Sequence, residues 1–136
     1  MPNDAPTDLD LTDLGSYSNA LGLTVTVATA DELQATWEVT DSLLQPHGLL
    51  HGGAHCAVVE TLASVAGSIW LGPEGQVVGT NNNTDFYRAT RTGERLTSIA
   101  RPLHRGRTRQ VWRVETYDDA QRLVAAGQVA LQNLRS

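Results

Sequence analysis

The amino-acid sequence predicts an α+β fold in which an antiparallel sheet of about six strands wraps around one long central helix. Residues 54–71 form a long apolar run that contains no proline and only one glycine, Gly67, which is typical of a buried helix. The second half of the chain instead has four extended segments separated by turn residues. Because the chain has 136 residues, we expect one domain to hold all of these elements.

The first half of the chain is expected to contain an arm and two strands. Residues 1–20 are polar and rich in aspartate, which predicts a flexible N-terminal arm and places the domain proper at residues 21–136. Apolar side chains alternate from Leu21 to Val27 and predict a strand. A second strand is predicted at residues 33–40, where four apolar side chains share one face: Leu33, Ala35, Trp37 and Val39.

The predicted helix at residues 54–71 is apolar on almost every side, which indicates that the protein buries it. Gly72 and Pro73 are expected to end it. Four further strands are predicted at residues 76–87, 94–104, 107–118 and 122–134. Long antiparallel strands combined with one buried helix are typical of a sheet wrapped around that helix.

The composition argues against several classes of protein. The net charge is -5 at pH 7, which disfavours general nucleic-acid binding, because neutralising phosphates requires clustered positive charge. Cys56 is the only cysteine, so no intramolecular disulfide can form, as is usual in a reducing compartment. The sequence has neither an apolar run of about 18 residues nor a basic and apolar leader. We therefore expect a cytoplasmic protein without a membrane partner.

Glu60 is the first candidate for chemistry, because it is a carboxylate in the middle of an apolar helix. Burying such a group is costly unless its charge is paired or used. Ser64 and Ser68 follow four and eight residues later, so they share its side of the helix. The alternative is that this polar stripe merely meets solvent or pairs with an arginine of the sheet.

His51, Gly52 and Gly53 lie where the helix is expected to begin. The first turn of a helix leaves backbone N–H groups unpaired, and the helix dipole makes that end positive. Because glycines let a ligand approach the backbone closely, the segment is a candidate oxyanion hole for a tetrahedral acyl intermediate. The alternative is that the two glycines only turn the chain into the helix.

Gly52 and Glu60 of one chain are too far apart to act on one carbonyl. They are eight residues apart, so a helical rise of roughly 1.5 Å per residue separates them by about 12 Å along the axis. Catalytic contacts lie near ~3 Å. If both residues are catalytic, Glu60 acts together with Gly52 of a second copy. The spacing therefore predicts a two-fold homodimer with active sites shared across its interface.

We expect no metal, no catalytic thiol and no cofactor. His47, His51 and His55 recur every four residues, but His47 precedes Gly48 in the expected loop, so the three would not share a helical face. No second cluster of ligands completes a zinc site. Cys56 has no partner base at a recognisable spacing.

The ten basic residues are all arginine, and four of them lie between positions 101 and 109. In an extended strand, Arg105, Arg107 and Arg109 would alternate onto one face. The arginine fork suits phosphate groups, such as those of coenzyme A. The alternative is a solvated edge strand whose charges oppose aggregation.

Together these residues resemble the hotdog-fold thioesterases, in particular the phenylacetate-pathway (PaaI-like) type and the Arthrobacter-type 4-hydroxybenzoyl-CoA thioesterases. The likeness covers residues 21–134 and rests on a combined pattern rather than on one motif. The runs at residues 81–86 and 103–107 are also similar to those of a group of actinobacterial proteins. The core of the pattern is the spacing of Gln45, His51, Gly52, Gly53, Glu60 and Ser64.

The resemblance implies a role for each matching residue. Glu60 would be the nucleophile or the general base, while the Gly52 N–H and the Gln45 side chain would polarise the thioester carbonyl. His51 would assist near the departing thiolate, and Ser64, where the family often has Thr, would position water. The implied contacts with substrate and coenzyme A are those of Asn83, Arg88, Arg105, Arg107, Thr108 and Arg109.

The resemblance implies hydrolysis of an acyl- or aryl-CoA thioester to a free acid and coenzyme A. The enzyme would be a homo-oligomer, at least a dimer and, as in relatives, a tetramer built from two dimers. A non-catalytic acyl-CoA sensor or carrier on the same fold is the alternative, although a binder has no need of a carboxylate beside the thioester. An enoyl-CoA hydratase would require a paired Asp and His at a spacing that the sequence lacks.

Overall fold

The computed structural model describes residues 9–135 of the chain. Part of the predicted N-terminal arm, residues 1–8, lies outside the described residues. The elements in chain order are α1 (Ser16–Asn19), β1 (Thr24–Ala28), β2 (Leu33–Glu38), the 3-10 turn η1 (Asp41–Leu43), α2 (Gly52–Leu71), β3 (Gly75–Phe86), β4 (Arg95–Arg105), β5 (Arg109–Asp118) and β6 (Leu123–Arg135).

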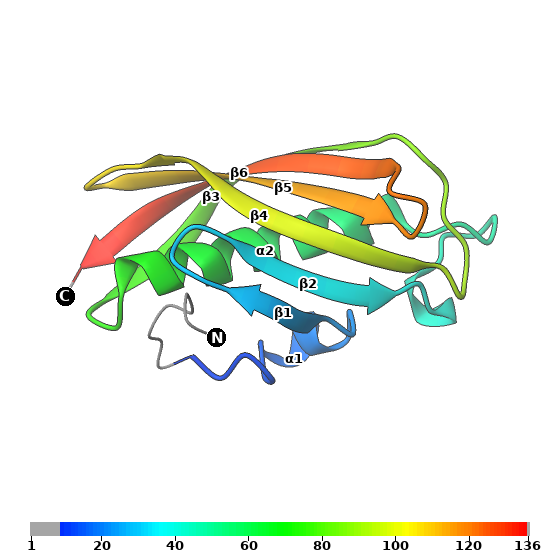
Figure 1. Ribbon diagram of the computed structural model, residues 1–136, viewed down its shortest axis with the longest axis horizontal. Coiled ribbons are helices and arrows are strands. Elements are labelled where there is room, and N and C mark those ends of the chain that lie inside the picture. Colours follow the sequence, from blue (N-terminus) through cyan, green and yellow to red (C-terminus); the bar gives the residue numbers. More distant parts are fainter. Residues whose placement is uncertain (1–8, 136) are drawn as a thin grey trace.

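Within residues 9–135 the strands form one six-stranded sheet in the order β1-β2-β4-β5-β6-β3, and every neighbouring pair is antiparallel. The sheet curves around the long helix α2, which lies along one of its faces (Figure 1). This arrangement confirms the predicted α+β fold. The predicted strand boundaries are also close to the observed ones, since β2 begins at Leu33 as expected and β5 begins at Arg109, two residues late.

Helix α2 contributes its buried side to the core between itself and the sheet. Val58, Val59 and Leu62 are almost completely buried, and each such side chain stabilises the fold by roughly 1.5–3 kcal/mol. At Gly67 the sheet approaches so closely that an added Cβ would lie 2.5 Å from Leu131 Cδ1. The four side chains predicted to share one face of the strand at residues 33–40 are all buried, although β2 ends at Glu38, one residue before the last of them: Leu33, Ala35, Trp37 and Val39.

Helix α2 is also the segment whose length and hydropathy would suit a membrane span. Half of that segment is buried inside the protein, which is the behaviour of a core helix. It ends at Gly72, whose φ of 90° lies in the region that favours glycine, and whose N–H bonds to Ser68 O. The predicted end of the helix is therefore confirmed. The other side of α2 is only half-buried and carries Glu60, Ser64 and Ser68.

Strand β3 forms one edge of the sheet. It pairs with β6 on one side, and no strand among residues 9–135 pairs with its other side. The pairing register shifts between Gly79 and Asn81, so the strand is irregular beside the middle of α2. A long strand with one unpaired edge offers backbone groups to a second chain.

Candidate active site

The N-terminus of α2 leaves one backbone donor unused. The side chain of His51 caps the helix, because its Nδ1 accepts a hydrogen bond from the Gly53 N–H at 2.7 Å. The Ala54 N–H bonds to the carbonyl of His51 at 2.9 Å. Within residues 9–135 the Gly52 N–H has no such partner, so it remains available at the positive end of the helix dipole.

The cap also determines which nitrogen of His51 can donate. Since Nδ1 accepts the Gly53 N–H, a neutral His51 ring carries its proton on Nε2. His51 lines a groove of about 310 Å³ at the start of the helix, together with Tyr17 and Gly53. A donor on Nε2 is what the predicted role near a departing thiolate requires.

Gln45 lies in the loop that follows η1, and its side chain is oriented by the backbone. Its Oε1 accepts a hydrogen bond from the His47 N–H, so its Nε2 group is left as a donor. Gln45 and Gly52 line a second groove of about 310 Å³ together with His55, Phe86 and Arg88. We call this cavity the Gln45 groove. It brings together the two groups predicted to polarise a carbonyl.

Phe86, at the end of β3, lies directly against the start of α2. A Cβ added to Gly52 would lie 2.6 Å from Phe86 Cε2, which is closer than van der Waals contact allows. The absence of a side chain at position 52 therefore lets the Phe86 ring pack against Gly52 in the first turn of the helix. This is a more specific reason for glycine than the turn that the sequence alone suggested.

Glu60 lies two turns further along α2 and faces strand β3. Its Oε1 accepts a hydrogen bond from Asn82 Nδ2 at 3.1 Å, and its Oε2 lies only 2.0 Å from the place of a Cβ on Gly79. Asn82 Nδ2 also bonds to the carbonyl of Cys56 at 3.0 Å, and Thr84 Oγ1 donates to Asn82 Oδ1 at 2.6 Å. A hydrogen bond thus holds the carboxylate against β3, and Gly79 leaves room for it there because it has no side chain.

Within residues 9–135 no arginine forms an ion pair with Glu60. Of the two structural alternatives for the polar stripe, pairing with an arginine of the sheet is therefore wrong. Gly52 and Glu60 both lie on α2, about 12 Å apart along its axis. One chain alone does not bring the two together.

The basic stretch differs from the sequence interpretation. Arg105 ends β4 and Arg109 begins β5, with residues 106–108 forming the turn between them. The predicted alternation of three arginines on one strand face is therefore wrong, because the strand reverses direction at Gly106, whose N–H bonds to Arg109 O at 2.8 Å. Arg107, Thr108 and Arg109 are exposed on this turn.

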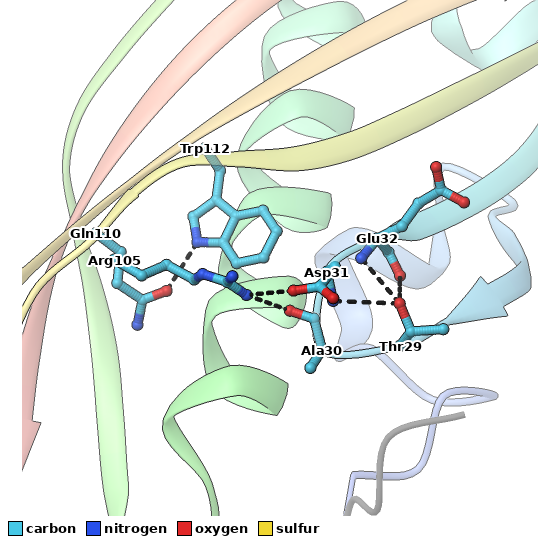
Figure 2. A network of polar contacts seen from close by, with 7 residues as sticks. All are labelled: Thr29, Ala30, Asp31, Glu32, Arg105, Gln110 and Trp112. Carbon is cyan, nitrogen blue, oxygen red and sulfur yellow. Dashed lines mark hydrogen bonds and ion pairs between the residues drawn. The ribbon is translucent and has the colours of Figure 1, made fainter. Parts of the chain in front are cut away.

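Arg105 has contacts inside the protein. Its Nη1 lies 2.7 Å from the carbonyl oxygen of Ala30 and 2.9 Å from Asp31 Oδ1, as Figure 2 shows. Its guanidinium also lies over the rings of Trp70 and Trp112, at 5.5 and 5.9 Å from their centroids. These contacts tie the β1–β2 turn to the end of α2, so the predicted contact of Arg105 with coenzyme A would have to compete with them.

We call residues 105–109, the turn between β4 and β5 with its arginines, the basic turn. It lies at the opposite end of α2 from Gly52. Trp70, which Arg105 covers, is eighteen residues beyond Gly52 on the helix, or about 27 Å along the axis. Of the other residues predicted to bind substrate or coenzyme A, Arg88 lines the Gln45 groove and Asn83 is exposed on β3. Arg88 and the basic turn therefore lie at opposite ends of the helix, while Asn83 lies on β3 next to Asn82, which contacts Cys56 and Glu60.

Sequence reasoning missed Gly79 and Asn82 as part of the Glu60 environment. The alternation of a strand places positions 82 and 84 on one face, but the sequence alone does not show that this face meets α2. Among residues 9–135, no group of three His, Cys, Asp or Glu side chains is placed to hold a metal ion. The absence of a metal or cofactor stays a prediction.

Comparison with known proteins points to one family. Residues 47–125 match the family model described as the thioesterase superfamily. A Mycobacterium tuberculosis protein described as a candidate esterase, Rv1847, is 45% identical over 136 residues, which cover 98% of this chain and 95% of the relative. The 1,4-dihydroxy-2-naphthoyl-CoA hydrolase of Escherichia coli is 39% identical over 99 residues, which cover 73% of this chain and 72% of the relative.

A solved structure is more similar still in sequence. The crystal structure of S. sahachiroi AziG superposes with a TM-score of 0.88 and is 56% identical, covering 91% of this chain and 100% of that chain. The similarity therefore extends over nearly the whole chain.

Proposed function

We propose, starting from the finding that this chain belongs to the thioesterase superfamily, that it hydrolyses an acyl- or aryl-CoA thioester to a free acid and coenzyme A. Thioester hydrolysis and the hotdog fold follow from the family and from relatives named as thioester hydrolases. Coenzyme A as the thiol is our proposal, supported by the name of the Escherichia coli relative. The groups at the start of α2 support binding of a thioester carbonyl.

The carbonyl oxygen of the thioester would lie at the start of α2. The Gly52 N–H has no hydrogen-bond partner in residues 9–135, and the Gln45 Nε2 is left to donate on the same groove. Two donors beside the helix N-terminus stabilise the negative charge that develops on this oxygen in the tetrahedral intermediate. This unpaired donor is the observation that carries the proposal.

The attacking group would come from a second copy. For Glu60 of the partner subunit to lie level with Gly52, the two helices must run antiparallel about a two-fold axis perpendicular to them. The half-buried stripe of α2 and the unpaired edge of β3 lie next to Glu60 and would meet their counterparts there. The proposed dimer therefore contains two equivalent sites, each built from both chains.

Two routes are compatible with this arrangement. In the first, Glu60 attacks the thioester carbon, the thiolate of coenzyme A leaves and takes up a proton, and water hydrolyses the resulting anhydride. In the second, Glu60 removes a proton from a water molecule held by Ser64, and the hydroxide attacks the same carbon; the tetrahedral intermediate then collapses with cleavage of the C–S bond, and the thiolate of coenzyme A leaves and takes up a proton. In both routes His51 Nε2 would donate toward the departing sulfur.

The same dimer would bring the basic turn toward the site. Trp70 lies ten residues beyond Glu60 on α2, or about 15 Å along the axis. In an antiparallel pair the basic turn of the partner subunit would therefore lie beyond the start of the first helix. The long arm of coenzyme A would extend in the same direction and place its phosphates near this turn. Arg107 and Thr108 are exposed there, and they are our candidates for holding the nucleotide.

The test is a thiol-release assay with aryl, short-chain and long-chain acyl-CoAs on wild type, Glu60→Gln and Glu38→Gln. We expect wild type to release thiol from at least one ester and Glu60→Gln to be slower by about 10²- to 10⁴-fold. Glu38→Gln, at the exposed end of β2, removes the same charge elsewhere and should stay fully active. Binding without release would favour the sensor or carrier, and an unimpaired Glu60→Gln would overturn the mechanism.

A further inference from the structure

Two buried amide side chains, Gln110 on β5 and Asn133 on β6, form a polar network that the proposed mechanism does not use. Gln110 is 0% exposed and Asn133 is 7% exposed, and Gln110 Nε2 donates a hydrogen bond to Asn133 Oδ1 at 2.8 Å. Burying an amide in a core costs free energy unless its donors and acceptor are paired. The partners of these two side chains therefore show what the network holds in place.

One end of the network holds the basic turn. Asn133 Nδ2 donates to the carbonyl oxygens of Gly106 and Arg107, at 3.0 and 3.2 Å. The Asn133 backbone N–H donates to the carbonyl oxygen of Thr108 at 2.9 Å. A single residue of β6 therefore bonds to three successive carbonyls of the turn, while the side chains of Arg107 and Thr108 are exposed. The backbone of the turn is thus fixed from inside the protein, and its side chains remain accessible to a ligand.

The other end of the network is anchored on helix α2 and in the core. Gln110 Nε2 also donates to the carbonyl oxygen of Gly67 at 3.2 Å, and Gln110 Oε1 accepts a hydrogen bond from Trp112 Nε1 at 2.7 Å (Figure 2). A Cβ on Gly67 would lie 2.9 Å from Gln110 Oε1, so the amide and the helix are in close contact. Because both N–H groups and the oxygen of Gln110 are used, the amide is fixed in one orientation.

A turn held in this way is suited to binding an anion. Within residues 9–135, neither Arg107 nor Arg109 forms an ion pair, so no carboxylate there neutralises their charges. Ordering a loose turn around a ligand would cost conformational entropy. A turn that the protein has already ordered avoids that cost, and the ligand binds more tightly.

We propose that Gln110 and Asn133 are positioning residues, which hold the basic turn in the conformation that binds the phosphates of the coenzyme A nucleotide. The inference rests on the proposed function, which assigns the nucleotide to Arg107 and Thr108. Gln110 and Asn133 act through the backbone of the turn and do not touch the substrate. Their effect is therefore confined to the affinity for the nucleotide, whereas a purely structural role would affect every substrate alike.

The test compares wild type with Asn133→Leu on two substrates: the acyl-CoA that wild type hydrolyses fastest, and the pantetheine thioester of the same acid. Pantetheine keeps the arm that carries the thioester but lacks the nucleotide and its phosphates. Leucine is close to asparagine in size and cannot bond to the turn. We expect KM for the acyl-CoA to rise by about 10-fold with kcat nearly unchanged, and KM for the pantetheine thioester to change by less than about 2-fold.

Ser98→Ala is the matched control. Ser98 is as buried as Gln110, and its hydroxyl bonds to the side chains of Trp37 and Thr116 in the same sheet. It lies seven residues before Arg105 on β4, or about 23 Å along the strand. The substitution should lower the free energy of unfolding without changing the ratio of the two KM values.

Two results would overturn this inference alone: a folded Asn133→Leu enzyme whose KM rises equally for both substrates, or one whose KM rises for neither. Thioester hydrolysis would stand in both cases. A folded wild type that releases thiol from no acyl-CoA of the panel would overturn the proposed function, and this inference with it. Circular dichroism and gel filtration check each variant, and Asn133→Ala replaces Asn133→Leu if the latter does not fold.

Discussion

Asn82 Nδ2 donates to Glu60 Oε1 at 3.1 Å and to the carbonyl oxygen of Cys56 at 3.0 Å, so one amide group joins edge strand β3 to one turn of helix α2. The carboxylate of Glu60 is held at one oxygen, while the other lies over Gly79. Because the carboxylate is already oriented, less free energy is needed to orient it for reaction.

Gly79→Ala should inactivate the enzyme without unfolding it. The added Cβ would lie 2.0 Å from Glu60 Oε2, so the carboxylate must swing away. The loss in kcat should be about 10²-fold, as for other small misplacements of catalytic groups. The check is kcat together with a urea unfolding curve, and a Gly79→Ala enzyme with wild-type kcat would show that the position of this carboxylate is unimportant.

Asn82→Ala tests the hydrogen bond itself. We expect kcat to fall by about 10-fold with little change in KM, because one hydrogen bond to a charged group is lost, worth about 1.5–3 kcal/mol. Asn81→Ala is the matched control, since the neighbouring residue of a strand points to the opposite face. Equal effects of the two substitutions would indicate a general weakening of β3 rather than a role in holding Glu60.

Gly52→Pro tests the oxyanion hole. Gly52 is the first residue of α2, where proline is well tolerated, and His51 already has the extended backbone that precedes proline, with ψ of 134°. The substitution removes the N–H, so kcat should fall by about 10²- to 10³-fold. Gly52→Ala meets the same Phe86 ring but keeps the N–H, and should be much more active. Similar rates for the two variants would exclude this N–H from catalysis.

His55 should make the stability of the fold depend on pH. Burial lowers its pKa to about 4 from 6.5, so between these values the unfolded chain binds the proton more strongly. The contribution of the neutral, buried His55 to the free energy of unfolding is complete above pH 6.5 and is lost as the pH falls towards 4. The total loss is about 3 kcal/mol. Urea unfolding of wild type and His55→Phe at pH 7 and pH 4.5 measures it.

Comparing wild type with His55→Phe isolates the effect of His55 on the pH dependence of stability. The pKa values of Asp10, Asp13 and Asp118 are lowered by hydrogen bonds, so they also cost stability in acid, but equally in both proteins. The free energies of unfolding of wild type and variant should therefore move apart or cross between the two pH values. A constant difference would contradict a neutral, buried His55.

Substitution of Arg105 should affect the stability of the fold, whereas substitution of Arg107 should affect substrate binding. Arg105→Ala removes an ion pair with the exposed Asp31 and two ring contacts, and should lower the free energy of unfolding by about 1–2 kcal/mol. Arg107→Ala should leave that free energy unchanged and raise KM for an acyl-CoA by roughly 10-fold. Arg107→Ala with an unchanged KM would remove this residue from the proposed nucleotide contact.

Much of the fold was predictable because its periodicities are local. The alternation in β2 and the apolar run of α2 predicted both elements, and burial of Trp37 and Val39 on one face confirmed the strand. Helix α2 nevertheless begins two residues before its predicted start, because the His51 side chain bonds to the Gly53 N–H and stabilises a first turn that contains two glycines. A cap formed by a histidine has no strong sequence signature.

Part of the site followed from local sequence. Glu60 lies on the predicted helix, and Gly52 lies eight residues before it on the observed α2, where the helix was expected to begin. The contact between Asn82 and Glu60 spans 22 residues of sequence and depends on the register of β3 against the helix. The internal contacts of Arg105 depend on Asp31, brought close by the β1–β2 turn. Such pairings arise from tertiary packing, which strand alternation does not specify.

The central claim is that each active site takes Gly52 from one chain and Glu60 from another, and subunit mixing tests it directly. Glu60→Gln and Gly52→Pro, each nearly inactive alone, are mixed and allowed to exchange subunits, and thiol release is measured. Half of the dimers are then mixed, and each mixed dimer has one site with both native groups, so about a quarter of the wild-type activity should return. Activity no greater than the sum of the two separate variants would contradict the shared site.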